Sequence, residues 1–199
     1  MNYETIIVGG GVSGLSCALT LSSANAKTEA LKNARYLIID AGKSDLNKAR
    51  LFNAPGIAAG TEGANALKTL NAQLAAYDAC DAAEGTVQSI EGEAGAFRVQ
   101  LAGGLAFVAK RVVLATGFHD FTIACGAETK TNARSPRPGK IELVHQNNRI
   151  RGGLYVAGLL AGEYTMFACA AGSGVKVACD ILSELGGQPA IVHDVTTAA

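Results

Sequence analysis

Short apolar runs recur along the chain and predict buried β-strands. Such runs are typical of strands that are covered on both faces of a sheet. Strands are predicted on this basis at residues 5–8, 36–40, 84–90, 111–115, 141–144 and 154–157. Residues 97–101 and 105–108 differ, because their apolar and polar positions alternate on either side of Ala102-Gly103-Gly104. That alternation predicts a hairpin.

Three longer segments have apolar residues at helical spacing. Helices are predicted over residues 15–23, 64–80 and 165–185, and Gly186-Gly187 ends the last of them. The first helix lies between the predicted strands 5–8 and 36–40. A strand–helix–strand unit of this kind implies that the two strands run parallel. The chain is therefore predicted to have an α/β fold.

Length and composition favour a single folded domain. The chain has 199 residues, of which 49% are hydrophobic, so disorder is excluded as a general description. We predict one domain over residues 1–199. Its segments 1–120 and 139–187 are joined by an irregular excursion, residues 121–138, and are followed by a tail, residues 188–199.

Charge and cysteine content exclude several classes of function. Lys plus Arg and Asp plus Glu each number 17, so no nucleic acid partner is expected. The five cysteines are odd in number and form no C-x-x-C pair, which predicts neither a disulfide framework nor a metal site. The apolar run 6–21 carries four glycines and no basic residue precedes it. We therefore expect a cytoplasmic protein with no membrane segment.

A glycine-rich loop follows the first predicted strand. Gly9, Gly11 and Gly14 match the G-x-G-x-x-G spacing of dinucleotide-binding loops, between a strand and a helix. The helix N-terminus offers free N–H groups and a partial positive charge to a pyrophosphate. Asp40 ends the next strand and can accept hydrogen bonds from a ribose, while its charge disfavours the 2′-phosphate of NADP. The alternative is an ordinary glycine-rich turn with Asp40 as a surface acid.

Four further segments carry a family resemblance. They are Asp40-Ala41-Gly42, Asn53-Ala54-Pro55-Gly56, Leu114-Ala115-Thr116-Gly117 and Gly153-Leu154-Tyr155-Val156-Ala157-Gly158. With the glycine loop, they resemble the motifs of the FAD domain of thioredoxin reductase-like flavoproteins, in the pyridine nucleotide-disulfide oxidoreductase family. The resemblance implies a three-layer ββα FAD/NAD(P)-binding, Rossmann-like domain. Such a domain has a parallel central sheet and a β-meander.

The same resemblance implies a set of FAD contacts along the chain. The pyrophosphate would lie on the glycine loop and the adenosine ribose at the end of the second strand. The adenine would meet the backbone of a later strand, and the flavin ring would lie near the start of the last helix. The residues implied are Gly9, Gly11, Val12, Ser13, Gly14, Asp40, Ala41, Asn53, Val87, Ala115, Thr116, Gly117, Gly158, Leu159 and Phe167.

The chain also departs from that family in three ways. The family's nicotinamide domain belongs between the second and third motifs, but residues 118–152 are far fewer than the roughly 100 that such a domain needs. No C-x-x-C is present for dithiol exchange. Leu159 stands where the third motif normally carries an aspartate. Together these departures predict an FAD domain without its nicotinamide domain.

The function expected from the sequence is FAD-dependent redox chemistry, and several alternatives remain open. The electron donor or acceptor is open among free NAD(P)H, a small molecule, oxygen and a partner protein, and a homodimer or a complex with a partner is expected. His119 and Cys125 are weak catalytic candidates, the alternatives being an ordinary loop histidine and a packing cysteine. The alternative functions are a non-enzymatic FAD- or nucleotide-binding module or partner subunit, and an NAD-dependent enzyme.

Overall fold

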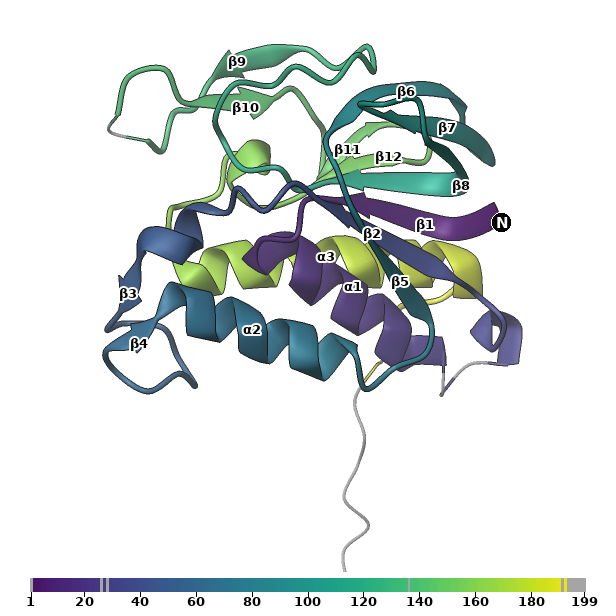
Figure 1. Ribbon diagram of the computed structural model, residues 1–199. Coiled ribbons are helices and arrows are strands. Elements are labelled where there is room, and N and C mark those ends of the chain that lie inside the picture. The colour runs from purple at the N-terminus through teal and green to yellow at the C-terminus, as the bar shows by residue number, and fades with distance from the viewer. Residues whose placement is uncertain (1, 26, 28, 136, 191, 193–199) are drawn as a thin grey trace, which may run out of the picture.

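Parallel strands form the centre of the molecule (Figure 1). The computed structural model describes residues 2–25, 27, 29–135, 137–190 and 192. The parallel strands of this part of the chain lie in the order β12, β8, β1, β2, β5. Their bounds are Leu154–Val156 for β12, Ala106–Leu114 for β8, Asn2–Val8 for β1, Tyr36–Asp40 for β2 and Cys80–Glu84 for β5.

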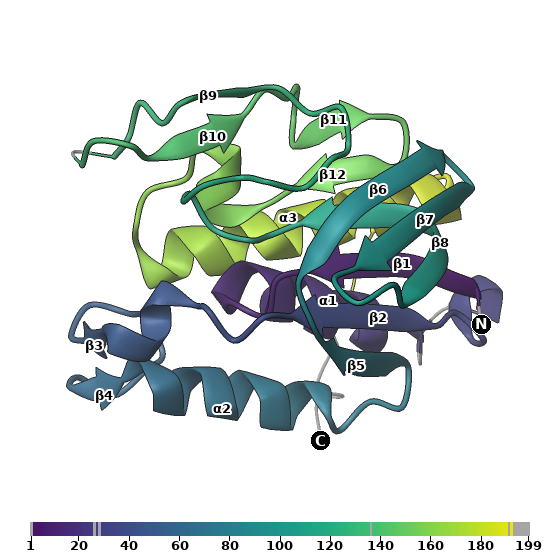
Figure 2. The same cartoon turned by 45° about the horizontal axis from the view of Figure 1, so that its top comes forward.

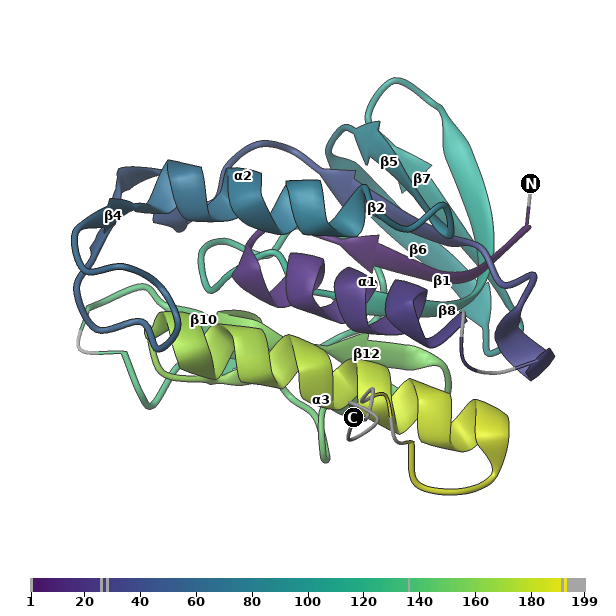
Figure 3. The same ribbon diagram turned by 90° about the horizontal axis from the view of Figure 1, so that it is seen from below.

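Three helices cover one face of this sheet, as the view from below shows (Figure 3). They are α1 (Val12–Asn25), α2 (Gly63–Leu74) and α3 (Phe167–Gly186). A meander covers the opposite face (Figure 2) and comprises β6 (Val87–Glu93), β7 (Ala96–Leu101) and the first part of β8. The predicted three-layer α/β fold, with a parallel central sheet and a meander, is confirmed.

Alternation within the central strands divides the core into two halves. Ile7 and Ile38 pack with helix residues such as Leu15, whereas their neighbours Ile6 and Leu37 pack against the meander. Every second side chain of a strand points to the same face, so a strand covered on both faces must be apolar throughout. This explains why the strands appear in the sequence as unbroken apolar runs.

Small residues allow α1 and α3 to approach closely. A Cβ added at Gly174 of α3 would lie 2.0 Å from the backbone oxygen of Ser13 on α1. No side chain fits in that space, so the glycine sets the distance between the two helices. Gly187, with φ of 65°, then terminates α3 in the left-handed conformation.

Short elements fill the connections between the main ones. The antiparallel pair β9 (Thr129–Thr131) and β10 (Ile141–Leu143) lies within and just after the predicted excursion. The other short elements are β3 (Arg50–Leu51), β4 (Thr61–Glu62), β11 (Arg149–Arg151) and the 3-10 turns η1 (Glu29–Leu31), η2 (Asp45–Lys48) and η3 (Gly158–Ala161). No helix in the described part of the chain is long and apolar enough to cross a membrane.

Three predicted boundaries were wrong. The helix predicted to reach residue 80 ends at Leu74, and Cys80 begins β5. The single strand predicted at 84–90 is the end of β5 and the start of β6, separated at Gly85. The two strands predicted at 105–108 and 111–115 are one strand, β8. The tail predicted at 188–199 lies mostly outside the described residues.

Candidate functional site

The carboxyl ends of four parallel strands meet at one edge of the sheet. The residues in register at this edge are Ile39 of β2, Val8 of β1, Leu114 of β8 and Val156 of β12. The segments that leave these strands are the glycine loop, the Asp40 segment, residues 115–117 and Gly158. The structure therefore brings together motifs that are far apart in the sequence. In open α/β sheets, ligands bind outside the carboxyl ends of the strands.

Two glycines of the loop are required by close backbone contacts. Gly9 has φ of 113°, and a Cβ there would lie 2.4 Å from the backbone oxygen of Ala115. A Cβ at Gly14 would lie 1.9 Å from the backbone oxygen of Gly9. Gly11 differs, because a Cβ there would meet only Ser44 Oγ, at 3.4 Å. Gly11 is thus the glycine that the protein's own packing demands least, as expected of a position kept small for a ligand.

Asp40 holds the glycine loop from the neighbouring strand. The Gly10 N–H donates a hydrogen bond of 2.9 Å to Asp40 Oδ1, and a Cβ at Gly10 would lie 2.5 Å from Asp40 Cγ. Oδ2 has no hydrogen-bond partner among the described residues and can accept bonds from a ribose. Gly10 was missing from the predicted site, although the Gly9-Gly10-Gly11 run contained it.

Two helix N-termini face this edge. α1 begins at Val12, directly after the glycine loop, and α3 begins at Phe167. The first turn of neither helix carries an acidic residue, and the N-cap Met166 provides no side-chain cap. Both ends therefore offer N–H groups and a partial positive charge to an anionic group.

The third motif packs directly on the glycine-loop helix. Gly158 has φ of 71°, and a Cβ there would lie 2.8 Å from the Cβ of Ser13. The Gly158 N–H donates to Ser173 Oγ at 2.9 Å. Leu159 is half-buried, and its carbonyl accepts a hydrogen bond of 3.1 Å from Asn132 Nδ2. Asn132 of the excursion thus holds the Leu159 backbone in place, a contact that the sequence did not suggest.

The remaining predicted contacts lie at the two ends of this edge. Val87 is buried at the start of β6, just after Gly85, whose N–H donates to the Asp40 carbonyl at 2.9 Å. At the other end, Ala54 and Phe167 belong to one small apolar cluster, which brings the exposed Asn53 segment to the start of α3. Residues 116 and 117 lie between these ends.

His119 lies at this edge, but outside the glycine loop itself. Its Nε2 lies 2.6 Å from Asp45 Oδ2, and its Nδ1 lies 2.8 Å from Lys140 Nζ. The imidazole is about half exposed. Neither Asp45 nor Lys140 was predicted, because they are distant in the sequence and carry no motif.

Cys125 does not fit the predicted redox role. The sequence left Cys125 open between a weak catalytic candidate and a packing cysteine, and the residue is only 7% exposed. Backbone hydrogen bonds between Ala124 and both Gln88 and Ile90 dock this segment on β6. Burial raises the pKa of the Cys125 thiol, so the reactive thiolate is disfavoured. The burial favours the alternative of a packing cysteine.

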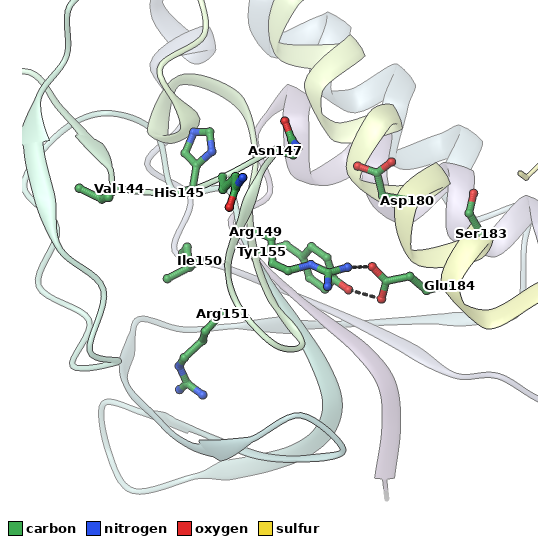
Figure 4. Close-up of a pocket in the computed structure, with 11 residues that line it drawn as sticks. Val144, His145, Asn147, Arg149, Ile150, Arg151, Tyr155, Asp180, Ser183 and Glu184 are labelled. Atoms are coloured by element: carbon green, nitrogen blue, oxygen red, sulfur yellow. Dashed lines mark hydrogen bonds and ion pairs between the residues drawn. The ribbon is translucent and has the colours of Figure 1, made fainter. Parts of the chain in front are cut away.

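A separate hollow of about 800 Å³ lies beside the sheet, between β11 and the second half of α3 (Figure 4). Several of its polar side chains already have partners. Glu184 forms an ion pair with Arg149 and accepts a hydrogen bond of 2.7 Å from the Tyr155 hydroxyl. His145 uses both ring nitrogens, with the Ala161 carbonyl and the Asn148 N–H. None of the predicted site residues lines this hollow.

Comparison with known proteins identifies the fold. No protein-family model and no curated protein matches the chain. An oxidoreductase from Agrobacterium tumefaciens is similar in structure, with a TM-score of 0.77 and 16% identity over 94% of this chain and 100% of that one. A thioredoxin reductase from Gloeobacter violaceus has a TM-score of 0.76 and 14% identity, over 98% of this chain and 99% of that one. A thioredoxin reductase from Streptococcus pyogenes has a TM-score of 0.68 and 13% identity, over 94% of this chain and 99% of that one.

These similarities show that the chain shares the fold of these proteins over nearly its whole length. The fold is the Rossmann-like fold expected from the sequence motifs.

Proposed function

We propose that the chain binds FAD and acts as a minimal, thioredoxin reductase-like redox flavoprotein without a nicotinamide domain. The observation that carries the proposal is the meeting of all the motif segments at one edge of the sheet. There, the loop has no room for a side chain at Gly9 or Gly14, and the absence of a side chain at Gly11 leaves one face of the loop open. A dinucleotide is the ligand that such a loop, with an acid on the neighbouring strand, accommodates.

The residues at this edge fit the parts of FAD in order. Gly11 and the first N–H groups of α1 would hold the pyrophosphate, and Asp40 Oδ2 would accept from the adenosine ribose. Val87 would lie near the adenine, while Thr116 and Gly117 would line the middle of the cofactor. The start of α3 at Phe167 would face the ring.

FAD supplies the redox chemistry when bound, and the chain supplies binding and electrostatics. The uncapped N-terminus of α3 would stabilise negative charge on a nearby ring by about 0.3–2 kcal/mol. The partner that gives or takes electrons would then be a diffusing molecule or a protein. In support, the short β9–β10 hairpin occupies the part of the chain where the family resemblance places a nicotinamide domain.

The experiment that tests the proposal is extraction and identification of the bound cofactor. The protein is purified without added nucleotide, denatured, and its supernatant analysed by chromatography and mass spectrometry. We expect FAD, and we expect titration of the cofactor-free protein with FAD to quench flavin fluorescence to a one-to-one endpoint. Recovery of NAD, or no response to FAD, would contradict the proposal.

A second measurement separates redox function from simple binding. Dithionite, NADH or NADPH is added to the FAD-loaded protein without oxygen. The visible absorbance of the oxidised flavin, at about 450 nm, is then followed. Reversible bleaching supports redox function. A bound flavin that none of these reductants bleaches would favour the alternative of a non-enzymatic FAD-binding module, to which the missing C-x-x-C and Leu159 also point.

A further inference from the structure

Three side chains form a hydrogen-bonded chain across the carboxyl edge of the sheet. Asp45 belongs to η2, which follows β2, and His119 follows β8. Because β1 lies between β2 and β8, the contact between these side chains crosses the end of β1, where the glycine loop begins. The neighbouring Ser44 Oγ lies 3.4 Å from the position of a Cβ at Gly11, so the Asp45 segment passes close to the loop.

The geometry fixes the role of each group in this chain. Lys140 Nζ has only protons to offer, so His119 Nδ1 must accept at 2.8 Å. Nδ1 is then the unprotonated nitrogen, and Nε2–H donates to Asp45 Oδ2 at 2.6 Å. The imidazole therefore links the Lys140 side chain to the Asp45 carboxylate, and each of its nitrogens has a partner.

All three side chains project from anchored backbone. The Asp45 turn is capped by Ser44, whose Oγ accepts from the Leu46 N–H. At the other side, the Phe118 carbonyl accepts a hydrogen bond of 3.0 Å from the Ile141 N–H, and Lys140 Nζ lies 4.7 Å from the centre of the Phe118 ring. Phe118 is only 6% exposed, so both ends of the link rest on buried or capped structure.

We propose that Asp45, His119 and Lys140 form a clamp that closes over the diphosphate of the bound cofactor and slows its release. The proposal rests on the proposed function, since it takes FAD as the ligand of the glycine loop. The link would then pass next to the loop that holds the diphosphate, since Ser44, beside Asp45, lies close to Gly11. The Lys140 ammonium would add a positive charge near that anionic group. Release of the cofactor requires the His119–Asp45 bond to open.

The test measures FAD release from the whole protein and from three variants. Asp45→Ala, His119→Ala and the double variant are loaded with FAD and diluted into a scavenger, and the recovery of flavin fluorescence is timed. Each single variant is expected to release FAD about fivefold faster, the effect of losing one exposed charge-assisted contact. The double variant should release it no faster than the singles, because the bond is already open.

The control is Lys48→Ala, which removes a charge from the same 3-10 turn and should leave the release rate unchanged. Unchanged rates in both single variants would overturn the clamp, as would a roughly 25-fold acceleration in the double variant, which independent effects would produce. A wild-type protein that takes up no FAD would remove the proposed function together with the clamp, so the two failures are distinguishable.

A second measurement needs no cofactor. The ¹⁵N spectrum of the histidine side chains is recorded at pH 8, and the His119 signals are assigned by their loss in His119→Ala. We expect the Nε2–H tautomer, with Nδ1 unprotonated. A proton on Nδ1 would be incompatible with the Lys140 contact and would overturn the proposed link.

Discussion

Two regions of the molecule, the glycine-loop edge and the hollow beside β11, offer opposite kinds of surface. The hollow is large, about 800 Å³, but two of its charged groups, Arg149 and Glu184, bind one another. The glycine-loop edge is made mostly of backbone, and its helix N-termini and Asp40 Oδ2 have free hydrogen-bonding capacity. Volume alone would favour the hollow, whereas unsatisfied polar groups and forced glycines favour the edge.

The difference between the two regions shows where local stability is sacrificed for ligand binding. Glycine costs conformational entropy, so within a glycine-rich loop at the carboxyl ends of the strands, a glycine that packing does not require favours a ligand at that position. Gly11 is such a position, whereas Gly9 and Gly14 serve both the fold and the site. The predictions below test whether the edge and the hollow are as separate in function as they are in chemistry.

The largest effect is expected where α3 meets the glycine-loop helix. Gly174→Ala would place a Cβ 2.0 Å from the Ser13 backbone oxygen, forcing the helices apart. We expect a loss of about 3 kcal/mol in the free energy of unfolding, measured by urea denaturation, and weaker FAD binding. The matched control is Gly172→Ala on the same helix, where a Cβ would meet nothing within 4 Å. That variant should gain about 0.5–1 kcal/mol, and equal effects at both positions would contradict the packing argument.

Gly11→Val should separate binding from folding. The Cβ of the added side chain meets only the Ser44 hydroxyl, at 3.4 Å, so the fold should persist, while the approach of a pyrophosphate is blocked. We expect the Kd for FAD to rise about 100-fold, roughly 2.7 kcal/mol, with a nearly unchanged circular dichroism spectrum. Normal FAD affinity in this variant would show that the ligand does not lie on the loop.

The sequence predicted the strands of this edge because each is an unbroken apolar run. It failed where strands are polar. β5 contains Asp81 and Glu84, and β11 is Arg149-Ile150-Arg151, so neither shows the pattern of a buried strand. Both lie toward the outside of the sheet, where one side of a strand is solvated. Their positions were set by pairing with β2 and β12, which a local pattern does not reveal.

The candidate site was predicted only as far as its motifs extended. Glycine spacing and strand ends indicated the loop, Asp40 and residues 115–117. The partners of His119 could not be predicted, because Asp45 is 74 residues away and Lys140 is 21 residues away. The sequence could not decide the role of Cys125, because the polar segment around it is docked onto β6 by tertiary hydrogen bonds.

Cys80 lies at the amino end of β5, away from the glycine-loop edge. Its titration should therefore change the stability of the fold without changing FAD binding. Burial first, and Asp81 second, raise the pKa of this thiol to about 11 from the usual 9. Because the folded-state pKa is the higher, its stabilising contribution is full below about pH 9 and is lost as the pH rises through about 11. We expect a loss on the order of 1–2 kcal/mol across that window in urea unfolding, with FAD affinity unaffected by this group.

The control for that titration is Cys80→Ala, which removes the ionising group. The free energy of unfolding of this variant should fall less than that of the wild type between pH 9 and 11. This holds even if the two proteins differ in free energy of unfolding at pH 8. Parallel curves for the two proteins would show that Cys80 is not the group responsible.

The smallest effect is expected in the hollow. Glu184→Gln removes the ion pair with Arg149 but leaves an oxygen to accept from the Tyr155 hydroxyl. Both charged side chains are partly exposed, so the free energy of unfolding should fall by no more than about 1 kcal/mol. Flavin fluorescence titration should give the wild-type Kd, because no predicted FAD contact lines the hollow. A tenfold weaker affinity would mean that the hollow and the glycine-loop edge are coupled through α3, and the separation argued from their chemistry would fail.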